Sequence, residues 1–302
     1  MRGIAVGVDA GGSSTVSSYS CDGSFAGVRT SGGAALSHFG VQEASDRIVQ
    51  AIHGLLHDMT PDAIHIGAAG AGRQAAARQL QAIVERAFPG ARVTVADDAH
   101  IAFRARVPEG SGAVLVAGTG SIAYAENGTQ AFRAGGYGPL LGDDGSGFAI
   151  GLAGVRTLAR VYDQRASADT LARDIADRLG VQTQPELFER IYGAPNPVAL
   201  LASLAPTVLA AAHRGERSAN RIVQSAASEL FDLVKSVAKK AGLLEERFPL
   251  VFSGGLLLEN TLLSYLLELR LQNELPGATI LKGANEPHRG ALAAAERSLA
   301  DA

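Results

Sequence analysis

Composition and charge place this chain among folded proteins and exclude several classes of function. The chain has 302 residues, of which 47% are apolar and 19% charged, so it can bury a core large enough to offset the entropy of folding. Its formal net charge is −3 and no basic stripe is present, so we expect no nucleic-acid partner. The only cysteine, Cys21, excludes an internal disulfide framework and any multi-cysteine metal site within one chain.

The start of the chain predicts a cytoplasmic protein. The opening apolar stretch reaches the acidic Asp9 too soon to form the apolar region of a signal peptide. No stretch approaches the run of about 20 apolar residues that a membrane-spanning helix requires. We therefore expect no membrane partner.

The first third of the chain predicts three strands and a helix, followed by a strand, a helix, another strand and a short helix. Alternating apolar residues and glycine turns indicate the strands, and apolar residues at helical spacing indicate the helices. The predicted strands are residues 4–9, 15–21, 25–30, 63–68 and 91–96. The predicted helices are residues 42–58, 74–88 and 99–106.

A stretch rich in Pro and Gly at residues 108–112 predicts a domain boundary, after which the opening pattern returns. The repeat predicts duplicated domains that face each other across a cleft, each contributing one glycine-rich hairpin. The returning strands are residues 113–117, 122–126 and 129–134. Helical patterns then run to about residue 242, and the last elements are a final clear strand at 248–252 and helices at 256–269 and 290–299.

Three turns rich in Gly, Ser and Thr follow predicted strands, at residues 10–13, 118–121 and 253–255. Small residues let backbone N–H groups approach a phosphate closely. One such turn is more often a plain hairpin, but three of them favour a nucleoside triphosphate. Asp9 ends the first strand beside the first turn, where it can hold Mg²⁺ directly or through water, or simply cap the turn.

Two adjacent carboxylates, Asp97 and Asp98, follow the strand of the predicted strand–helix–strand unit. Open α/β sheets bind their ligands at the carboxyl edge of the strands. Adjacent side chains cannot both point outward, so we expect Asp98 to act as a base for a substrate hydroxyl while Asp97 caps the following helix. The alternative is that both are capping or turn residues.

Four motifs together resemble a known family. They are Gly-Val-Asp-Ala-Gly-Gly-Ser-Ser-Thr at 7–15, Ala-Asp-Asp-Ala at 96–99, Gly-Thr-Gly-Ser at 118–121 and the glycine-rich stretch at 135–147. In this order they resemble N-acetylglucosamine kinases and, more broadly, the BadF/BadG/BcrA/BcrD ATPase family of the sugar kinase, actin and heat-shock chaperone superfamily. The resemblance covers nearly the whole chain.

The resemblance implies an α/β fold of two actin-like (ribonuclease H-like) domains facing a nucleotide cleft. The N-terminal domain, residues 1–108 plus 287–302, would carry the first phosphate hairpin, the catalytic aspartate and the sugar side. The C-terminal domain, residues 109–286, would carry the second hairpin and the adenosine site. A homodimer that uses a small sugar and ATP is implied by resemblance alone.

The resemblance also implies roles for individual residues. Asp98 matches the family's catalytic aspartate, and Asp143 matches a carboxylate that binds sugar hydroxyls. Gly136 and Tyr137 would line the sugar pocket. The ATP-binding residues would be Gly11, Gly12, Ser13 and Thr15 of the first hairpin, Gly118, Thr119, Gly120 and Ser121 of the second, and Gly254 and Gly255 beside the adenosine.

The implied reaction transfers the γ-phosphoryl group of ATP, with Mg²⁺, to a hydroxyl of N-acetylglucosamine or a related hexosamine, most simply O6. The identity of the sugar stays open because the sequence departs from the family at several positions. Ser13 replaces a usual Thr and Tyr137 replaces a frequent Trp, and both changes are tolerable; the two departures that follow bear on the sugar. Ala35 stands where amino-sugar kinases use Asn, and residues 67–70 have no Ser. Glucosamine and N-acetylmuramic acid are therefore alternative substrates.

Three rival functions were weighed against the kinase. The family's iron–sulfur activators need two cysteines per subunit, and the lone Cys21 excludes them. The spacing Gly70-x-Gly72-x-x-Ala75 fits dinucleotide binding by an oxidoreductase, but three strands precede it and the strand–helix–strand unit of a kinase explains the same residues. A non-catalytic regulator that binds ATP or a sugar stays open, although Asp98 argues against it.

Overall fold

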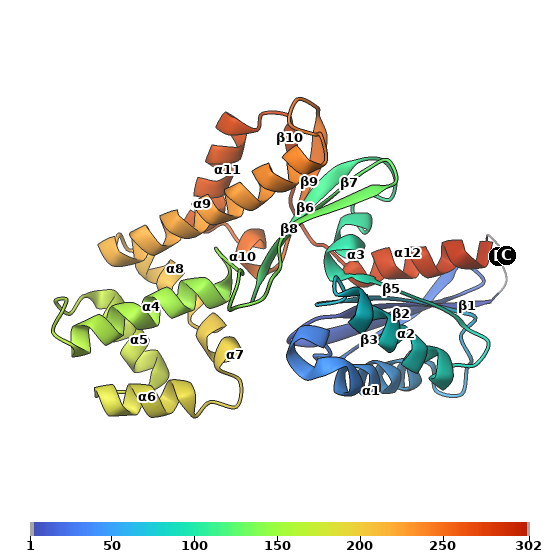
Figure 1. Ribbon diagram of the computed structural model, residues 1–302, viewed down its shortest axis with the longest axis horizontal. Coiled ribbons are helices and arrows are strands. Elements are labelled where there is room, and N and C mark those ends of the chain that lie inside the picture. The colour runs from blue at the N-terminus through green and yellow to red at the C-terminus, as the bar shows by residue number, and fades with distance from the viewer. Residues whose placement is uncertain (1–2, 301–302) are drawn as a thin grey trace. The chain divides into compact units, whose positions relative to one another are not determined.

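The computed structural model describes residues 3–300. Residues 1, 2, 301 and 302, which the predicted N-terminal domain includes, lie outside the described residues. The chain divides into two compact units (Figure 1). Unit 1 comprises Met1–Gly110 and Ala284–Ala302, and unit 2 comprises Ser111–Gly283.

Unit 1 contains a five-stranded mixed sheet in the order β3-β2-β1-β4-β5. The first three strands form antiparallel hairpins, whereas β4 and β5 run parallel to β1. The carboxyl ends of β1, β4 and β5 therefore meet at one edge of the sheet. The strands are β1 (Ile4–Ala10), β2 (Ser14–Cys21), β3 (Ser24–Gly32), β4 (Ala63–Ala68) and β5 (Arg92–Asp97).

Helices cover both faces of this sheet (Figure 1). Val6 and Val8 pack in a core with α1 (Leu36–Leu56) and α2 (Gln74–Ala87), whereas Ala5 of the same strand packs with Leu292 of α12. This alternation follows from the two-residue period of a strand. The opposite face carries α3 (Asp98–Arg104) and α12 (Pro287–Ala300).

Glycines let α12 approach its neighbours closely. A Cβ atom on Gly7 of β1 would lie 2.2 Å from the Leu292 backbone nitrogen, and one on Gly290 would lie 2.2 Å from the Ile101 carbonyl oxygen of α3. Both positions therefore require glycine. The C-terminal helix consequently braces the strand that carries Asp9 and the helix that begins at Asp98.

Unit 2 repeats the same sheet in the order β10-β9-β6-β7-β8. The strands β6, β7 and β8 are antiparallel hairpins, and β9 and β10 run parallel to β6. Both units are mixed α/β structures, so the predicted α/β class is confirmed. The strands are β6 (Gly112–Ala117), β7 (Ser121–Asn127), β8 (Gln130–Gly135), β9 (Phe248–Ser253) and β10 (Ala278–Leu281).

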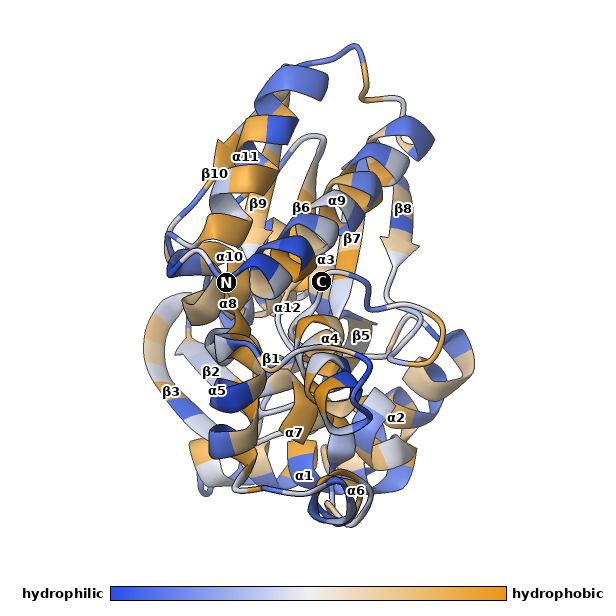
Figure 2. Cartoon of the chain, turned by 90° about the vertical axis from the view of Figure 1, so that its left-hand side faces the viewer, coloured by the Kyte–Doolittle hydropathy of each residue, from blue (hydrophilic) through white to orange (hydrophobic). Residues whose placement is uncertain are grey.

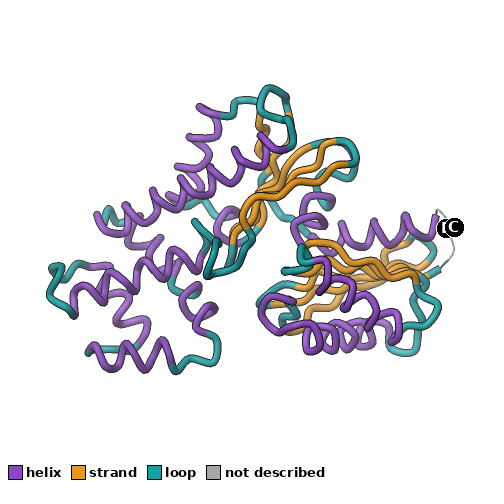
Figure 3. The backbone as a smooth tube through the Cα atoms, in the orientation of Figure 1, coloured by secondary structure: helices purple, strands orange, loops and turns teal. Residues whose placement is uncertain are grey.

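The long helix α9 (Arg217–Lys240) packs on this sheet, and the other helices of unit 2 pack against it or against one another (Figure 3). Figure 2 shows that strand β9 is largely apolar, which suits its burial between β10 and β6. The remaining helices are α4 (Gly147–Tyr162), α5 (Thr170–Leu179), α6 (Gln184–Tyr192), α7 (Pro197–Ala202), α8 (Ala205–His213), α10 (Gly255–Leu258) and α11 (Leu262–Glu274). Among residues 3–300, no single helix is long and apolar enough to cross a membrane. One pair of segments, Pro197–His213 and Arg217–Lys240, reaches the required length and hydropathy only when taken together, and the two are bent by 116°.

Three sequence predictions of local structure were wrong. The strand at residues 248–252 is not the last one, because the short β10 pairs with it. The predicted helix at 256–269 is two helices, since Thr261 and Ser264 form a capping box that starts α11 afresh. Helix α1 begins at Leu36 rather than residue 42 and is interrupted at Gly40, which has a φ of 73°.

Candidate functional site

The first hairpin turn is held by the segment that precedes α1. The Gly11 N–H donates to the Ser14 carbonyl oxygen, and the Ala34 N–H donates to the Gly11 carbonyl oxygen, each at 3.0 Å. A Cβ atom on Gly12 would lie 2.6 Å from the His38 ring, so a larger residue here would have to displace that ring. Among the described residues, no protein acceptor bonds the backbone N–H groups of Gly12 and Ser13. The turn therefore presents two N–H groups that can bind an anion.

Thr15, also predicted to bind phosphate, follows this turn on β2, where it pairs with Ala10. Its side chain is fully buried, and its Oγ1 atom has no hydrogen-bond partner among the described residues. A buried hydroxyl without a partner is costly. Ser13, by contrast, is exposed at the tip of the turn.

Three carboxylates lie at the carboxyl edge of the unit 1 sheet. Asp9 pairs with Gly67 of β4, which in turn pairs with Ala96 of β5, immediately before Asp97. Asp97 is the N-cap of α3 and Asp98 is its first residue. Both accept a hydrogen bond from the Ala99 N–H, at 3.2 Å for Asp97 and 3.0 Å for Asp98.

The surroundings of Asp9 and Asp98 disfavour negative charge. Burial raises the pKa of Asp98 well above its ordinary value, and the charge and side-chain hydrogen bond of Asp97 and the charge of Asp9 raise it further, against the Ala99 N–H. Burial also raises the pKa of Asp9, from 3.8 to about 6. Such a group of carboxylates is typical of a site that takes up a proton or a cation.

The raised pKa of Asp9 predicts a pH-dependent stability. Because the folded protein holds this proton more tightly than the unfolded chain, the free energy of unfolding falls as pH rises from about 4 to about 6. The neutral variant Asp9→Asn avoids this loss. We therefore expect its free energy of unfolding to exceed that of the wild type by about 2 kcal/mol near pH 8 and by little near pH 4. Urea unfolding of the variant and of the wild type, in the presence of EDTA and at both pH values, measures this difference. A variant less stable than the wild type near pH 8 would contradict the assignment.

The second hairpin turn sits at the start of α4 in unit 2. The N–H groups of Gly147 and Phe148 donate to the carbonyl oxygens of Gly118 and Thr119, at 2.8 and 3.1 Å. In a trans peptide the N–H points opposite to the C=O. The N–H groups of Thr119 and Gly120 therefore point away from α4. This turn also presents two donors suited to an anion.

The glycine-rich loop before α4 packs directly on the second hairpin. Asp143 accepts a hydrogen bond from the Ser121 N–H at 3.3 Å, and its carboxylate lies 2.8 Å from the place of a Cβ atom on Gly120. The Gly136 N–H donates to the Ser121 carbonyl oxygen at 3.0 Å. Tyr137, next in the chain, is 65% exposed. The fold thus brings the second hairpin, Asp143, Gly136 and Tyr137 into one cluster.

The third turn lies beside the second hairpin, because Ser253 of β9 pairs with Val116 of β6. Gly254 has a φ of 90°, and a Cβ atom on it would lie 2.3 Å from the Ala117 carbonyl oxygen. A Cβ atom on Gly255 would meet no atom within 4 Å. Only Gly254 is therefore required by the fold, while Gly255 borders open space.

Sequence reasoning missed several residues that shape these turns. The Gly147 N–H orients the second hairpin, and Arg133 donates to the carbonyl oxygens of Gly135 and Gly136. Ser146 caps α4 by accepting from the Ala149 N–H at 3.2 Å. A Ser before a helical pattern is a recognisable start signal. The role of Arg133 has no such local signal.

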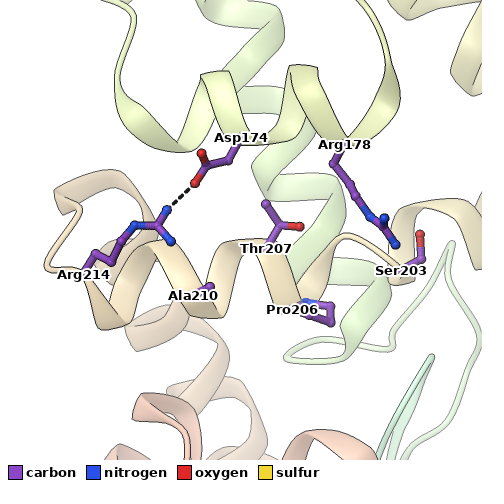
Figure 4. Close-up of a pocket in the computed structure, with 7 residues that line it drawn as sticks. All are labelled: Asp174, Arg178, Ser203, Pro206, Thr207, Ala210 and Arg214. Carbon is purple, nitrogen blue, oxygen red and sulfur yellow. Dashed lines mark hydrogen bonds and ion pairs between the residues drawn. The ribbon is translucent and has the colours of Figure 1, made fainter.

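A hollow of about 380 Å³ lies elsewhere in unit 2, between α5 and α8 (Figure 4). Arg214 forms an ion pair with Asp174 on one side, and Arg178 lies on the other. None of the predicted site residues lines it. The candidate site therefore rests on the glycine turns and carboxylates, not on this hollow.

A model of the BadF/BadG/BcrA/BcrD ATPase family matches residues 6–296. The chain belongs to this family. It is 31% identical over 196 residues to an N-acetylmuramic acid/N-acetylglucosamine kinase of Clostridium acetobutylicum, covering 65% of this chain and 64% of that protein. It is 35% identical over 184 residues to an N-acetyl-D-glucosamine kinase of Dictyostelium discoideum, covering 60% of this chain and 57% of that one. The matched regions span less than two thirds of both relatives.

Solved structures support the fold. A crystal structure from Chromobacterium violaceum, provisionally named an N-acetylglucosamine kinase, matches 97% of this chain and 98% of its own with a TM-score of 0.79 at 24% identity. A ROK family glucokinase of Streptomyces griseus, solved with glucose and AMPPNP, matches 98% and 99% with a TM-score of 0.58 at 19% identity. The predicted actin-like fold is confirmed by these neighbours.

Proposed function

We propose that this protein transfers the γ-phosphoryl group of ATP to a hydroxyl of an amino sugar, N-acetylglucosamine or a close relative, at O6. The observation that carries the proposal is Asp98 at the carboxyl edge of the unit 1 sheet, with a pKa raised by burial and by neighbouring carboxylates. The names of the two curated relatives support an amino-sugar substrate. Membership of an ATPase family supports the use of ATP.

Asp98 would act as the general base. As the sugar oxygen attacks the γ-phosphorus, the proton of that hydroxyl passes to the Asp98 carboxylate, and the bond from phosphorus to the ADP oxygen breaks. A base whose pKa lies closer to the working pH takes up this proton more readily. Asp97 would fix the position of Asp98 because it caps α3 through the same Ala99 N–H.

Each hairpin, within its own unit, would bind phosphate. The N–H groups of Gly12 and Ser13 in unit 1, and of Thr119 and Gly120 in unit 2, are suited to phosphate oxygens. Glycine at positions 11, 12, 118 and 120 keeps side chains from crowding the phosphates. Gly254 and Gly255 would border the adenosine.

Mg²⁺ fits Asp9 on chemical grounds. This buried carboxylate, with its pKa raised to about 6, would be stabilised by a cation. No group of three or more metal-ligating side chains occurs among residues 3–300, and Mg²⁺ usually takes only one or two carboxylates together with phosphates and water. The bound ion would neutralise charge on the transferred phosphoryl group.

Sugar recognition would come from the cluster of Gly136, Tyr137 and Asp143. The Asp143 carboxylate can accept hydrogen bonds from sugar hydroxyls, and the exposed Tyr137 ring can lie against the apolar face of a sugar. Ala35 occupies the N-cap position of α1, and its methyl side chain has no amide group that could bind a sugar. Glucosamine and N-acetylmuramic acid therefore remain alternative substrates within the proposal.

A coupled assay of ADP release tests the proposed function. The protein with Mg-ATP is given N-acetylglucosamine, glucosamine, N-acetylmuramic acid, N-acetylmannosamine or glucose, with a sugar-free control. We expect release with an amino sugar to exceed the control by at least about 100-fold, because closure around a bound acceptor excludes water as a competing nucleophile. Release equal to the control for every sugar would overturn the kinase and favour an ATP- or sugar-binding regulator.

A further inference from the structure

Arg133 makes an unusual set of contacts on β8. Its Nη2 atom donates to the carbonyl oxygens of Gly135 and Gly136, at 3.2 and 2.7 Å. Its guanidinium also lies over the Tyr137 ring, 5.7 Å from the centre. Within residues 3–300 no carboxylate forms an ion pair with it. A partly buried arginine whose donors serve only main-chain carbonyls and a ring acts on the conformation of that segment.

The segment that Arg133 contacts is rich in glycine and is also held by the Gly136 N–H, which donates to the Ser121 carbonyl oxygen. Gly135, Gly136 and Gly138 have φ values of 74°, 68° and 84°, which only glycine adopts readily. A Cβ atom on Gly136 would lie 2.8 Å from the Ile122 side chain, so a larger residue at this position would also have to displace that side chain. Glycine runs lose much entropy when they are ordered. The Arg133 side chain, which donates to two successive carbonyl oxygens, therefore adds to the contacts that hold this segment.

We propose that Arg133 is a positioning residue that sets the affinity for the sugar by holding Gly135, Gly136 and the Tyr137 ring in the binding conformation. The inference rests on the proposed function, because it assigns Tyr137 to the sugar pocket. The planar guanidinium is needed, since it can donate to the carbonyls and lie on the ring at once. A lysine amine at this position lacks that geometry.

Steady-state kinetics and hydrogen–deuterium exchange of Arg133→Met and Arg133→Lys test the inference. We expect the KM for the best sugar to rise about tenfold in Arg133→Met, with kcat and the KM for ATP changed by less than about twofold. In Arg133→Lys, the KM for the sugar should lie between those of the wild type and Arg133→Met. Amide exchange at residues 135–141 should become faster in the free variant, with or without sugar-kinase activity.

The matched control is Lys240→Met. Lys240 of α9 donates to the Arg133 carbonyl oxygen at 2.8 Å, so this variant removes a contact to the same residue without touching the glycine segment. We expect its KM for the sugar and its exchange at 135–141 to equal those of the wild type. In the double variant Arg133→Met/Tyr137→Ala, the KM for the sugar should exceed that of Tyr137→Ala by less than the rise that Arg133→Met causes alone, because Arg133 acts partly through this ring.

The outcomes separate this inference from the proposed function. An active wild type with an unchanged sugar KM or unchanged exchange in Arg133→Met overturns the inference alone. A purely structural role would instead lower the thermal stability, lower kcat and raise the KM values for both the sugar and ATP to a similar extent. That result would also overturn the inference. A wild type that phosphorylates no sugar overturns the proposed function and the role in sugar affinity, while the exchange experiment still decides whether Arg133 holds the segment.

Discussion

Replacing Asp98 with asparagine should lower kcat for sugar phosphorylation by about 10³-fold or more, with the affinity for ATP nearly unchanged. The amide of asparagine has the size of the carboxylate and can still accept from the Ala99 N–H, now at 3.0 Å. It cannot take a proton from a sugar hydroxyl. Rapid-mix measurement of a single turnover, together with calorimetry of ATP binding, separates loss of chemistry from loss of the nucleotide.

The neighbouring variant Asp97→Asn is the matched control. Asparagine caps a helix as well as aspartate, so α3 should keep its start. Loss of the adjacent charge lowers the pKa of Asp98, because that charge helps to raise it. We expect activity within about tenfold of the wild type, with its decline on acidification displaced to lower pH. An inactive Asp97→Asn beside an active Asp98→Asn would mean that the two residues exchange roles.

Much of this fold could be predicted because its signals are local. The strand Ala63–Ala68 is buried along its whole length and apolar except at His65, and the helix Gln74–Ala87 has apolar residues on one face, so both were predicted within a residue. The repeat of a glycine-ended hairpin predicted the two similar sheets. The strand Ala278–Leu281 was missed because it has four residues, none of them fully buried, and takes its conformation from pairing with β9.

The site divides in the same way. Glycine turns and an aspartate pair after a strand carry their own chemical signal, so they could be proposed from the sequence. The contact of Asp143 with the Ser121 N–H joins residues that are 22 positions apart in the sequence. The hydrogen bonds from Arg133 to the glycine segment depend on the positive φ angles of Gly135 and Gly136. Such contacts come from tertiary structure, which no local pattern encodes. Adjacent glycines also look alike in a sequence although the fold uses them differently.

Gly254 and Gly255 give the clearest case of this difference. Gly254→Ala should lower the free energy of unfolding by about 3 kcal/mol, because alanine is strained at a φ of 90° and its Cβ atom would lie 2.3 Å from the Ala117 carbonyl oxygen. Gly255→Ala should change it by less than about 0.5 kcal/mol, since its Cβ atom meets nothing within 4 Å. Urea unfolding of both variants measures the contrast.

The larger variant Gly255→Val then separates folding from binding at this turn. Its side chain points into space that the protein leaves open, so stability should stay close to that of Gly255→Ala. If the adenosine lies there, as proposed, the KM for ATP should rise about tenfold while the KM for the sugar does not change. An unchanged KM for ATP would move the adenosine away from Gly255. Equal destabilisation by Gly254→Ala and Gly255→Ala would instead contradict the geometry of the turn itself.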